Sequence, residues 1–105
     1  RMSLVNRLAG IGTAEGGRIP VAKFWACLYE LAQGKMTRQN LIDYIGLDAQ
    51  ETTELDWLIG RYNAQPNATA KSKFVELMQV IFYLCETGVP GYTTNAAIVA
   101  RINAI

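Results

Sequence analysis

Apolar and polar residues follow the period of an α-helix along almost the whole chain. The most apolar segment, residues 74–85 (FVELMQVIFYLC), has only two polar residues. These two, Glu76 and Gln79, share one narrow side of a helix, and Tyr83 continues that side one turn later. A helix that is apolar around most of its circumference must be covered on most sides. We therefore expect a helix at about residues 69–86 that is the centre of a small bundle or takes part in an oligomer interface.

The rest of the chain contains further segments with helical spacing of apolar residues, and each follows a residue that favours a helix start. These starting residues are Ser3, Thr37, Asp48, Thr93 or Thr94, and Pro20, which suits the first turn of the helix that it starts. Gly34, Gly46 and the turn at residues 63–67 (NAQPN) end the intervening helices. Since no segment shows sustained strand alternation, the sequence predicts an all-α fold. We expect one domain, residues 1–105, built as a compact bundle of five or six short helices around the central apolar helix.

Composition and charge narrow the classes of partner. Half of the residues are apolar and 18% are charged, which argues against disorder and provides enough apolar side chains for one core. Ten Lys and Arg residues against nine Asp and Glu residues give a net charge of +1. This near-balance provides no general attraction to nucleic acid or to an anionic membrane. The apolar run is also too short to span a bilayer, and we see no secretory signal peptide.

Histidine is absent, and the two cysteines lie inside apolar helical patterns. The chain therefore lacks the commonest general base and the commonest metal ligand. Cys27 lies beside Lys23 on the polar side of its helix, but no residue is placed to activate its thiol. We interpret Cys27 as partly exposed and unreactive, or as covered by another helix. We expect Cys27 and Cys85 to be free thiols in a reducing compartment, and we expect no catalytic residue, cofactor or metal.

The glycine-rich segment at residues 10–17 (GIGTAEGG) invites comparison with a phosphate-binding loop. A P-loop needs the pattern GxxxxGK[ST] between a strand and a helix, so that backbone N–H groups and a lysine surround the phosphates. Here the spacing differs, no lysine follows and no strand precedes. We therefore interpret this segment as a flexible loop between two helices.

Residues 37–62 have the outline of a helix-turn-helix motif, with Gly46 in the turn. The helix that would read DNA carries four acidic residues, which only Arg61 offsets, and these would repel phosphate groups. The four are Asp48, Glu51, Glu54 and Asp56. No calcium-loop pattern is present among them. We interpret the first two as a capping box and the other two as a solvated face.

Trp57 is the residue that most suggests a binding surface. It lies about 200° around its helix from Leu55, away from the apolar stripe. Aromatic side chains at such positions are enriched in interfaces, although a neighbouring segment, such as the glycine loop, could instead cover the ring. The last helix is more apolar than a solvated tail, so it docks on the helix at residues 69–86 or joins a partner. The candidate interface residues are Trp57, Ile98, Val99, Ile102 and Ile105.

Several segments together resemble a known group of proteins. Residues 56–59 (DWLI), 74–86 (FVELMQVIFYLCE) and 88–94 (GVPGYTT), followed by a short Ala-rich helix, are similar to segments of small, mostly uncharacterised helical proteins encoded by tailed bacteriophages and prophages. The opening segments LVNRLAG and IPVAKFW fit the same resemblance. It covers most of the chain, provides no catalytic or binding residue, and implies a phage origin with a virion, tail-accessory or assembly role. The corresponding location is the bacterial host cytoplasm or the phage virion.

These observations lead to one principal hypothesis and two alternatives. We expect a non-enzymatic phage or prophage protein that acts through protein–protein contacts, with itself as a homo-oligomer or with another phage protein. The first alternative is a small DNA-binding regulator of the helix-turn-helix type. The second is an enzyme, which the missing histidine and the lack of paired functional groups make the weakest of the three.

Overall fold

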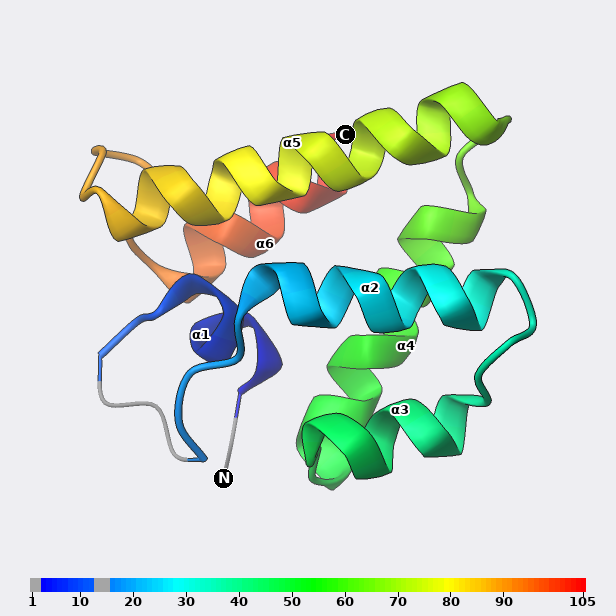
Figure 1. Cartoon of the computed structure of the whole chain (residues 1–105). Helices are drawn as coiled ribbons and strands as arrows, with labels where there is room; N and C mark the ends of the chain where they lie inside the picture. The colour runs from blue at the N-terminus through cyan, green and yellow to red at the C-terminus, as the bar shows by residue number, and fades with distance from the viewer. Residues whose placement is uncertain (1–2, 13–15) are drawn as a thin grey trace.

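Six α-helices form the regular structure of residues 3–12 and 16–105, the part of the chain that the computed structural model describes. No strand occurs within these residues (Figure 1). The radius of gyration is 13.1 Å, close to the value of about 13 Å expected for one domain of about 100 residues. The prediction of an all-α bundle is confirmed. The helices are α1 (Leu4–Ala9), α2 (Val21–Ala32), α3 (Arg38–Ile45), α4 (Ala49–Asn63), α5 (Ala68–Glu86) and α6 (Asn95–Asn103).

Side-chain caps explain why the helix boundaries are so readable in the sequence. A side-chain oxygen accepts a hydrogen bond from a backbone N–H in the first turn of every helix except α2. The capping residues are Ser3, Thr37, Asp48, Asn67 and Thr94. α2 starts directly after Pro20, which precedes the helix and does not lie within its first turn as predicted. α1 and α3 end at Gly10 and Gly46, whose φ angles of 71° and 82° suit glycine.

α5 and the short α1 each pack against three other helices. Figure 1 shows α5 along one edge of the molecule, with α6 behind it and the short α1 lying lower, beside α2. α5 packs mainly against α6, α1 and α4, while α2 packs against α3. α1 contacts α4, α5 and α6, so this six-residue helix shares with α5 the central position that the sequence assigned to α5.

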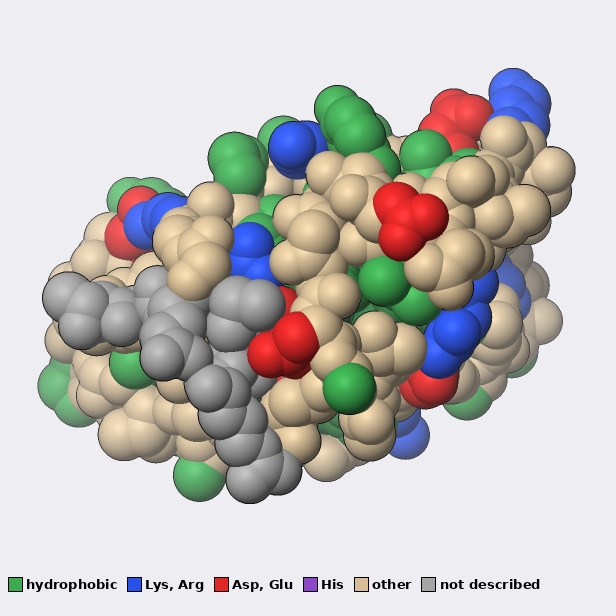
Figure 2. Space-filling model, turned by 90° about the horizontal axis from the view of Figure 1, so that it is seen from below, with side chains coloured by type: hydrophobic (Ala, Val, Ile, Leu, Met, Phe, Trp, Pro, Cys, Tyr) green, Lys and Arg blue, Asp and Glu red, His purple; other side chains and the backbone are tan. Residues whose placement is uncertain are grey.

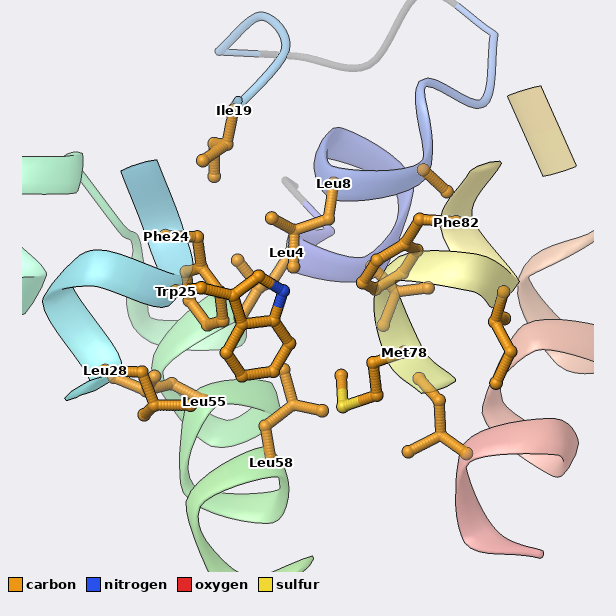
Figure 3. Close-up of a cluster of buried hydrophobic side chains, with 14 of the residues drawn as sticks. Leu4, Leu8, Ile19, Phe24, Trp25, Leu28, Leu55, Leu58, Met78 and Phe82 are labelled. Atoms are coloured by element: carbon orange, nitrogen blue, oxygen red, sulfur yellow. The ribbon is translucent and has the colours of Figure 1, made fainter. Parts of the chain in front are cut away.

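The core is built around the apolar side chains of α1. Leu4, Val5 and Leu8 are completely buried. In Figure 3, Leu4 and Leu8 lie between Trp25 of α2 on one side and Phe82 of α5 on the other. Each fully buried side chain of this size stabilises the fold by about 1.5–3 kcal/mol relative to an exposed one. A helix too short to be stable alone is therefore held almost entirely by tertiary packing.

A buried ion pair joins α1 to α4. Nη1 of Arg7 lies 2.8 Å and 3.0 Å from the two carboxylate oxygens of Glu51. The Glu51 side chain is completely shielded from solvent, and Arg7 is nearly so. Arg7 also donates through Nε to the carbonyl of Gly17, through Nη2 to that of Gly16 and through Nη1 to that of Gly46. A charge removed from water is tolerated only when it is paired and hydrogen-bonded, so this geometry fixes the position of α1 against α4.

The same arginine anchors one end of the glycine-rich loop. Residues 13–15 of that loop, which we expected to be flexible, lie outside the described residues. The carbonyls of Gly16 and Gly17 accept hydrogen bonds from Arg7, as given above, and the N–H of Ile19 donates to the Arg7 carbonyl at 3.1 Å. The end of the loop that leads into α2 is therefore tied back to α1.

Glu54 of α4 caps the N-terminus of α1. Its carboxylate accepts hydrogen bonds from the backbone N–H groups of Leu4 at 3.0 Å and Val5 at 3.3 Å, and from the Ser3 hydroxyl at 3.2 Å. A negative charge is favourable at this end of a helix, where backbone N–H groups lack partners. The prediction that Glu54 belongs to a solvated face is therefore wrong. It is a second polar link between α4 and α1.

Removal of one member of the buried ion pair should destabilise the protein strongly. We expect Glu51→Ala to lower the free energy of unfolding by about 3–5 kcal/mol, because it leaves the Arg7 charge buried without its carboxylate. Urea denaturation followed by circular dichroism measures this loss. The double variant Arg7→Met, Glu51→Leu is the control and should recover part of it, since two apolar side chains need no counter-charge. A loss below about 1 kcal/mol for Glu51→Ala would show that the pair does not hold α1.

Candidate functional site

α5 has a buried inner face and an exposed outer face. The inner face contributes four buried side chains to the core, which are Phe74, Met78, Ile81 and Phe82. On the outer face Leu77, Val80 and Tyr83 are 37%, 50% and 62% exposed. The helix is apolar almost all round, but its neighbours cover only one side of it. The described residues of the chain therefore leave part of the apolar surface of α5 uncovered.

The exposed residues of α5 follow the spacing by which one helix packs along another. Lys73, Leu77, Val80, Leu84 and Thr87 lie alternately four and three residues apart on the outer side of the helix. This is the spacing of the a and d positions in a coiled coil. We call these five residues the α5 seam. Leu84 is half-buried and the other members are exposed, on a helix that Figure 1 shows along one edge of the molecule.

A hollow of about 370 Å³ lies beside this helix, between α2, α4 and α5. Its walls are mostly apolar, with two phenol groups and one amide as the polar groups that line it. The lining residues are Ala22, Trp25, Ala26, Leu28, Tyr29, Tyr62, Val75 and Gln79. Ala22 and Ala26 open the hollow because their side chains are too short to fill the space between the helices. The indole N–H of Trp25 is sealed from solvent and has no hydrogen-bond partner among the described residues, so it provides no accessible donor to an occupant.

The hollow adjoins the outer face of α5 on the side nearest α2. Tyr29, at the hollow, is 58% exposed. Gln79, also at the hollow, lies four residues before Tyr83, and Tyr83 lies three residues after Val80, so Tyr83 neighbours both on the helix surface. The seam, Tyr83 and the Tyr29 rim therefore form one largely apolar region.

The lower face of the molecule carries side chains of mixed chemical type. Figure 2 shows acidic and basic side chains dispersed there among polar and isolated apolar groups. On α3 and α4, Arg38 and Asp56 form an exposed bidentate pair at 2.7 Å and 2.9 Å. The hydrogen bond from Arg38 holds the pKa of Asp56 below its usual value. Tyr44 of α3 is as exposed as Tyr83, but the ammonium group of Lys23 lies 4.5 Å from its ring centre.

The structure places Trp57 in a contact within the chain. Trp57 is half-buried, packs against the core, and donates from Nε1 to the side-chain oxygen of Asn103 at 2.9 Å. Arg61, one turn later, donates to the carbonyls of Asn103 and Ile105 at 3.0 Å and 3.3 Å. The C-terminal end of α6 therefore lies on α4. A neighbouring segment does contact the ring, and that segment is the C-terminal end of α6.

The same docking changes the interpretation of α6. Ile98 and Ile102 are completely buried in the core of their own chain, so their assignment to a partner interface is corrected. Val99 and Ile105 are half-buried and pack against that core. Of the two alternatives given by the sequence, the structure shows α6 docked on α5. The sequence did not identify Leu77 and Val80 as exposed. A usable signal was present, because Tyr83 lies on the same side of the helix as the polar residues Glu76 and Gln79.

Other chemistry is sparse in the described part of the chain. Cys27 is buried, Cys85 is half-buried and both are free, and burial raises the pKa of each thiol. A raised pKa keeps a thiol protonated and weakly nucleophilic.

Within residues 3–12 and 16–105 there is no cluster of three or more His, Cys, Asp or Glu side chains suited to a metal ion. The helices described here all fall short of the length and apolar character needed to cross a membrane.

Comparisons of the chain with models of protein families, with curated proteins and with solved structures give no match. The candidate site is therefore defined by its geometry alone. It consists of an exposed apolar face of α5 and a hollow beside that face, in a fold held together elsewhere by buried polar contacts.

The contact between α4 and α6 gives a test of the position of Trp57. Trp57→Ala should lower the free energy of unfolding by about 1–3 kcal/mol, since it removes part-buried packing and a hydrogen bond. Trp57→Phe keeps most of the packing and should cost about 1 kcal/mol. Both are measured by urea denaturation. A loss below about 0.5 kcal/mol for Trp57→Ala would be typical of an unattached surface residue and would contradict this contact.

Proposed function

We propose that this protein is a non-enzymatic helical module that acts by binding another protein on the outer face of α5. The observation that carries the proposal is the exposure of Leu77, Val80 and Tyr83 along one face of one helix. Single exposed apolar residues are common on protein surfaces and need no explanation. Three at helical spacing, bordered by a hollow, form a continuous patch of the kind that marks an interaction site.

The shape of the site favours a helical partner. A helix laid along the α5 seam would bury Leu77 and Val80, and one of its bulky apolar side chains would enter the hollow between α2 and α5. Tyr83 and Tyr29 lie beside this path, and tyrosine is among the residues that contribute most to binding energy. Burial of apolar surface would provide the affinity at about 25 cal/mol per Å² before the costs of association.

The resemblance to small helical proteins of tailed phages supports a more specific role within this class. A virion, tail-accessory or assembly component works by contact with other proteins, which is the activity proposed for α5. On this basis the products of the genes adjacent to this protein's own gene are the first candidate partners.

The alternatives receive less support from the contacts of α4. Its acidic residues are largely used inside the molecule, with Glu51 paired to Arg7, Glu54 capping α1 and Asp56 paired to Arg38. Arg61, its basic residue, binds the C-terminal end of α6. A DNA-reading helix needs basic and polar side chains directed outward from the protein. For an enzyme, the described residues provide no convergent set of titratable groups at the hollow.

Direct binding measurements test the proposed function. The purified products of adjacent genes are passed over immobilised wild-type protein, the Val80→Glu variant and the matched control Tyr44→Glu. We expect at least one product to bind, with an affinity lowered about tenfold or more by Val80→Glu, because a buried unpaired charge opposes association. Tyr44→Glu alters an equally exposed aromatic residue on α3 and should change the affinity less than about twofold.

Two results would contradict the proposal. One is binding that Val80→Glu and Tyr44→Glu weaken equally, which would place the contact elsewhere on the protein. The other is the absence of any binding partner among the adjacent products together with an absence of self-association. Circular dichroism of both variants confirms that they are folded before the comparison.

A further inference from the structure

We infer that the partner on the outer face of α5 is a second copy of this chain, with the two α5 helices antiparallel about a two-fold axis at Val80. The inference rests on the proposed function, since it names the occupant of the same face. Its basis is the order of apolar and charged residues along the α5 seam. That order is complementary to itself in one orientation and repulsive in the other.

The apolar residues of the face are symmetric about Val80. Leu77 and Leu84 lie about 40–60° around the helix to one side of Val80, and Glu76 and Tyr83 lie as far to the other side. In an antiparallel two-fold pair, residues on the same side and equally distant from the centre meet across the interface. Val80 then meets its own copy, and Leu77 meets Leu84 of the second copy. Tyr83 meets Glu76 of the second copy, where its hydroxyl donates to the carboxylate.

The charges at the ends of the seam select the antiparallel orientation. Lys73 lies seven residues before Val80 and Thr87 seven residues after it, so Lys73 reaches the C-terminal end of the second α5. The last turn of that helix (residues 83–86, YLCE) has no basic residue and includes Glu86. Its carbonyls attract a cation, because the C-terminal end of a helix carries partial negative charge. Glu86 already has a partner in Arg18 at 2.9 Å, but both side chains are about half exposed and leave room for a second cation.

A parallel pair lacks this complementarity. It would place Lys73 against Lys73, and it would align the two helix dipoles. Like charges that face each other repel. The antiparallel arrangement replaces the repulsion at Lys73 with an attractive contact and sets the two helix dipoles in opposite directions.

The position of α5 permits such a pair. α5 has 19 residues, which corresponds to about 28 Å of helix, and it forms one edge of the molecule (Figure 1). Leu77 and Val80 remain 37% and 50% exposed at the middle of the seam, while Leu84 is half-buried. A single helical seam is at the low end of interface sizes, below about 1,200 Å² in total. The dimer should therefore be weak and dependent on concentration.

Sedimentation equilibrium from about 5 µM to about 1 mM tests the inference over the range of weak affinities. We expect the mass of the wild-type protein to rise from the monomer value of 11.6 kDa toward twice that value. Val80→Glu should abolish the rise, and Tyr44→Glu should leave it unchanged. Lys73→Glu should weaken the dimer about threefold or more, because it places an anion at the C-terminal end of the second α5. In a parallel pair the same change exchanges one like-charge contact for another and leaves the affinity unaltered.

Disulfide formation tests the register. At the two-fold axis the Cα atoms of two copies of residue 80 come close enough for a disulfide, about 4.4–6.8 Å. Mild oxidation of Val80→Cys should therefore give a covalent dimer. The wild-type protein, with Cys27 and Cys85, and the variant Tyr44→Cys control for random oxidation, and we expect both to remain monomeric on a non-reducing gel.

Three results would overturn the inference: a wild-type protein that is monomeric at every concentration, a dimer that Val80→Glu leaves intact, or a dimer in which Val80→Cys does not crosslink above the controls. These failures are distinct from failure of the proposed function. A strict monomer that binds an adjacent gene product, and loses that binding in Val80→Glu, would overturn the second copy as occupant and retain the α5 face as a binding surface.

Discussion

The buried ion pair between Arg7 and Glu51 holds α1 against α4, and the apolar side chains of α1 are buried in the core. It fixes a helix of only six residues at the centre of the bundle, where Leu4 and Leu8 pack between α2 and α5. Glu54 strengthens the same attachment by capping the N-terminus of α1. α5 packs on α1 with one face, and Leu77, Val80 and Tyr83 of its other face stay exposed.

The two faces of α5 have different physical roles. Its inner face is closely packed and contributes to the free energy of folding, while its outer face retains apolar surface that burial would stabilise. The seam of α5 includes Lys73 and is bordered by Glu76, so these charges constrain which partner fits and in which direction. The hollow beside Tyr29 extends the same surface toward α2. Self-association and binding of a different protein would use the same face and would therefore compete.

The helices could be predicted from the sequence because each signal is local. Ser3, Thr37 and Asp48 cap the first turns that follow them, and Gly10 and Gly46 occupy the left-handed conformation at helix ends. The positions of Trp57, Ile98 and Glu54 could not be predicted in the same way, because contacts between distant segments decide them. A helical wheel gives the side on which Trp57 lies but not that α6 contacts that side. It likewise gives α5 an apolar circumference without showing which part of it stays uncovered.

The most direct measurement compares two adjacent residues of α5 by urea denaturation at low micromolar protein concentration, where association is negligible. Ile81 belongs to the inner face and Val80 to the outer face. The account predicts that Ile81→Ala lowers the free energy of unfolding by about 2–5 kcal/mol, whereas Val80→Ala changes it by no more than about 0.5 kcal/mol. Comparable losses for the two variants would show that the outer face of α5 is part of the monomer core, which would contradict the account.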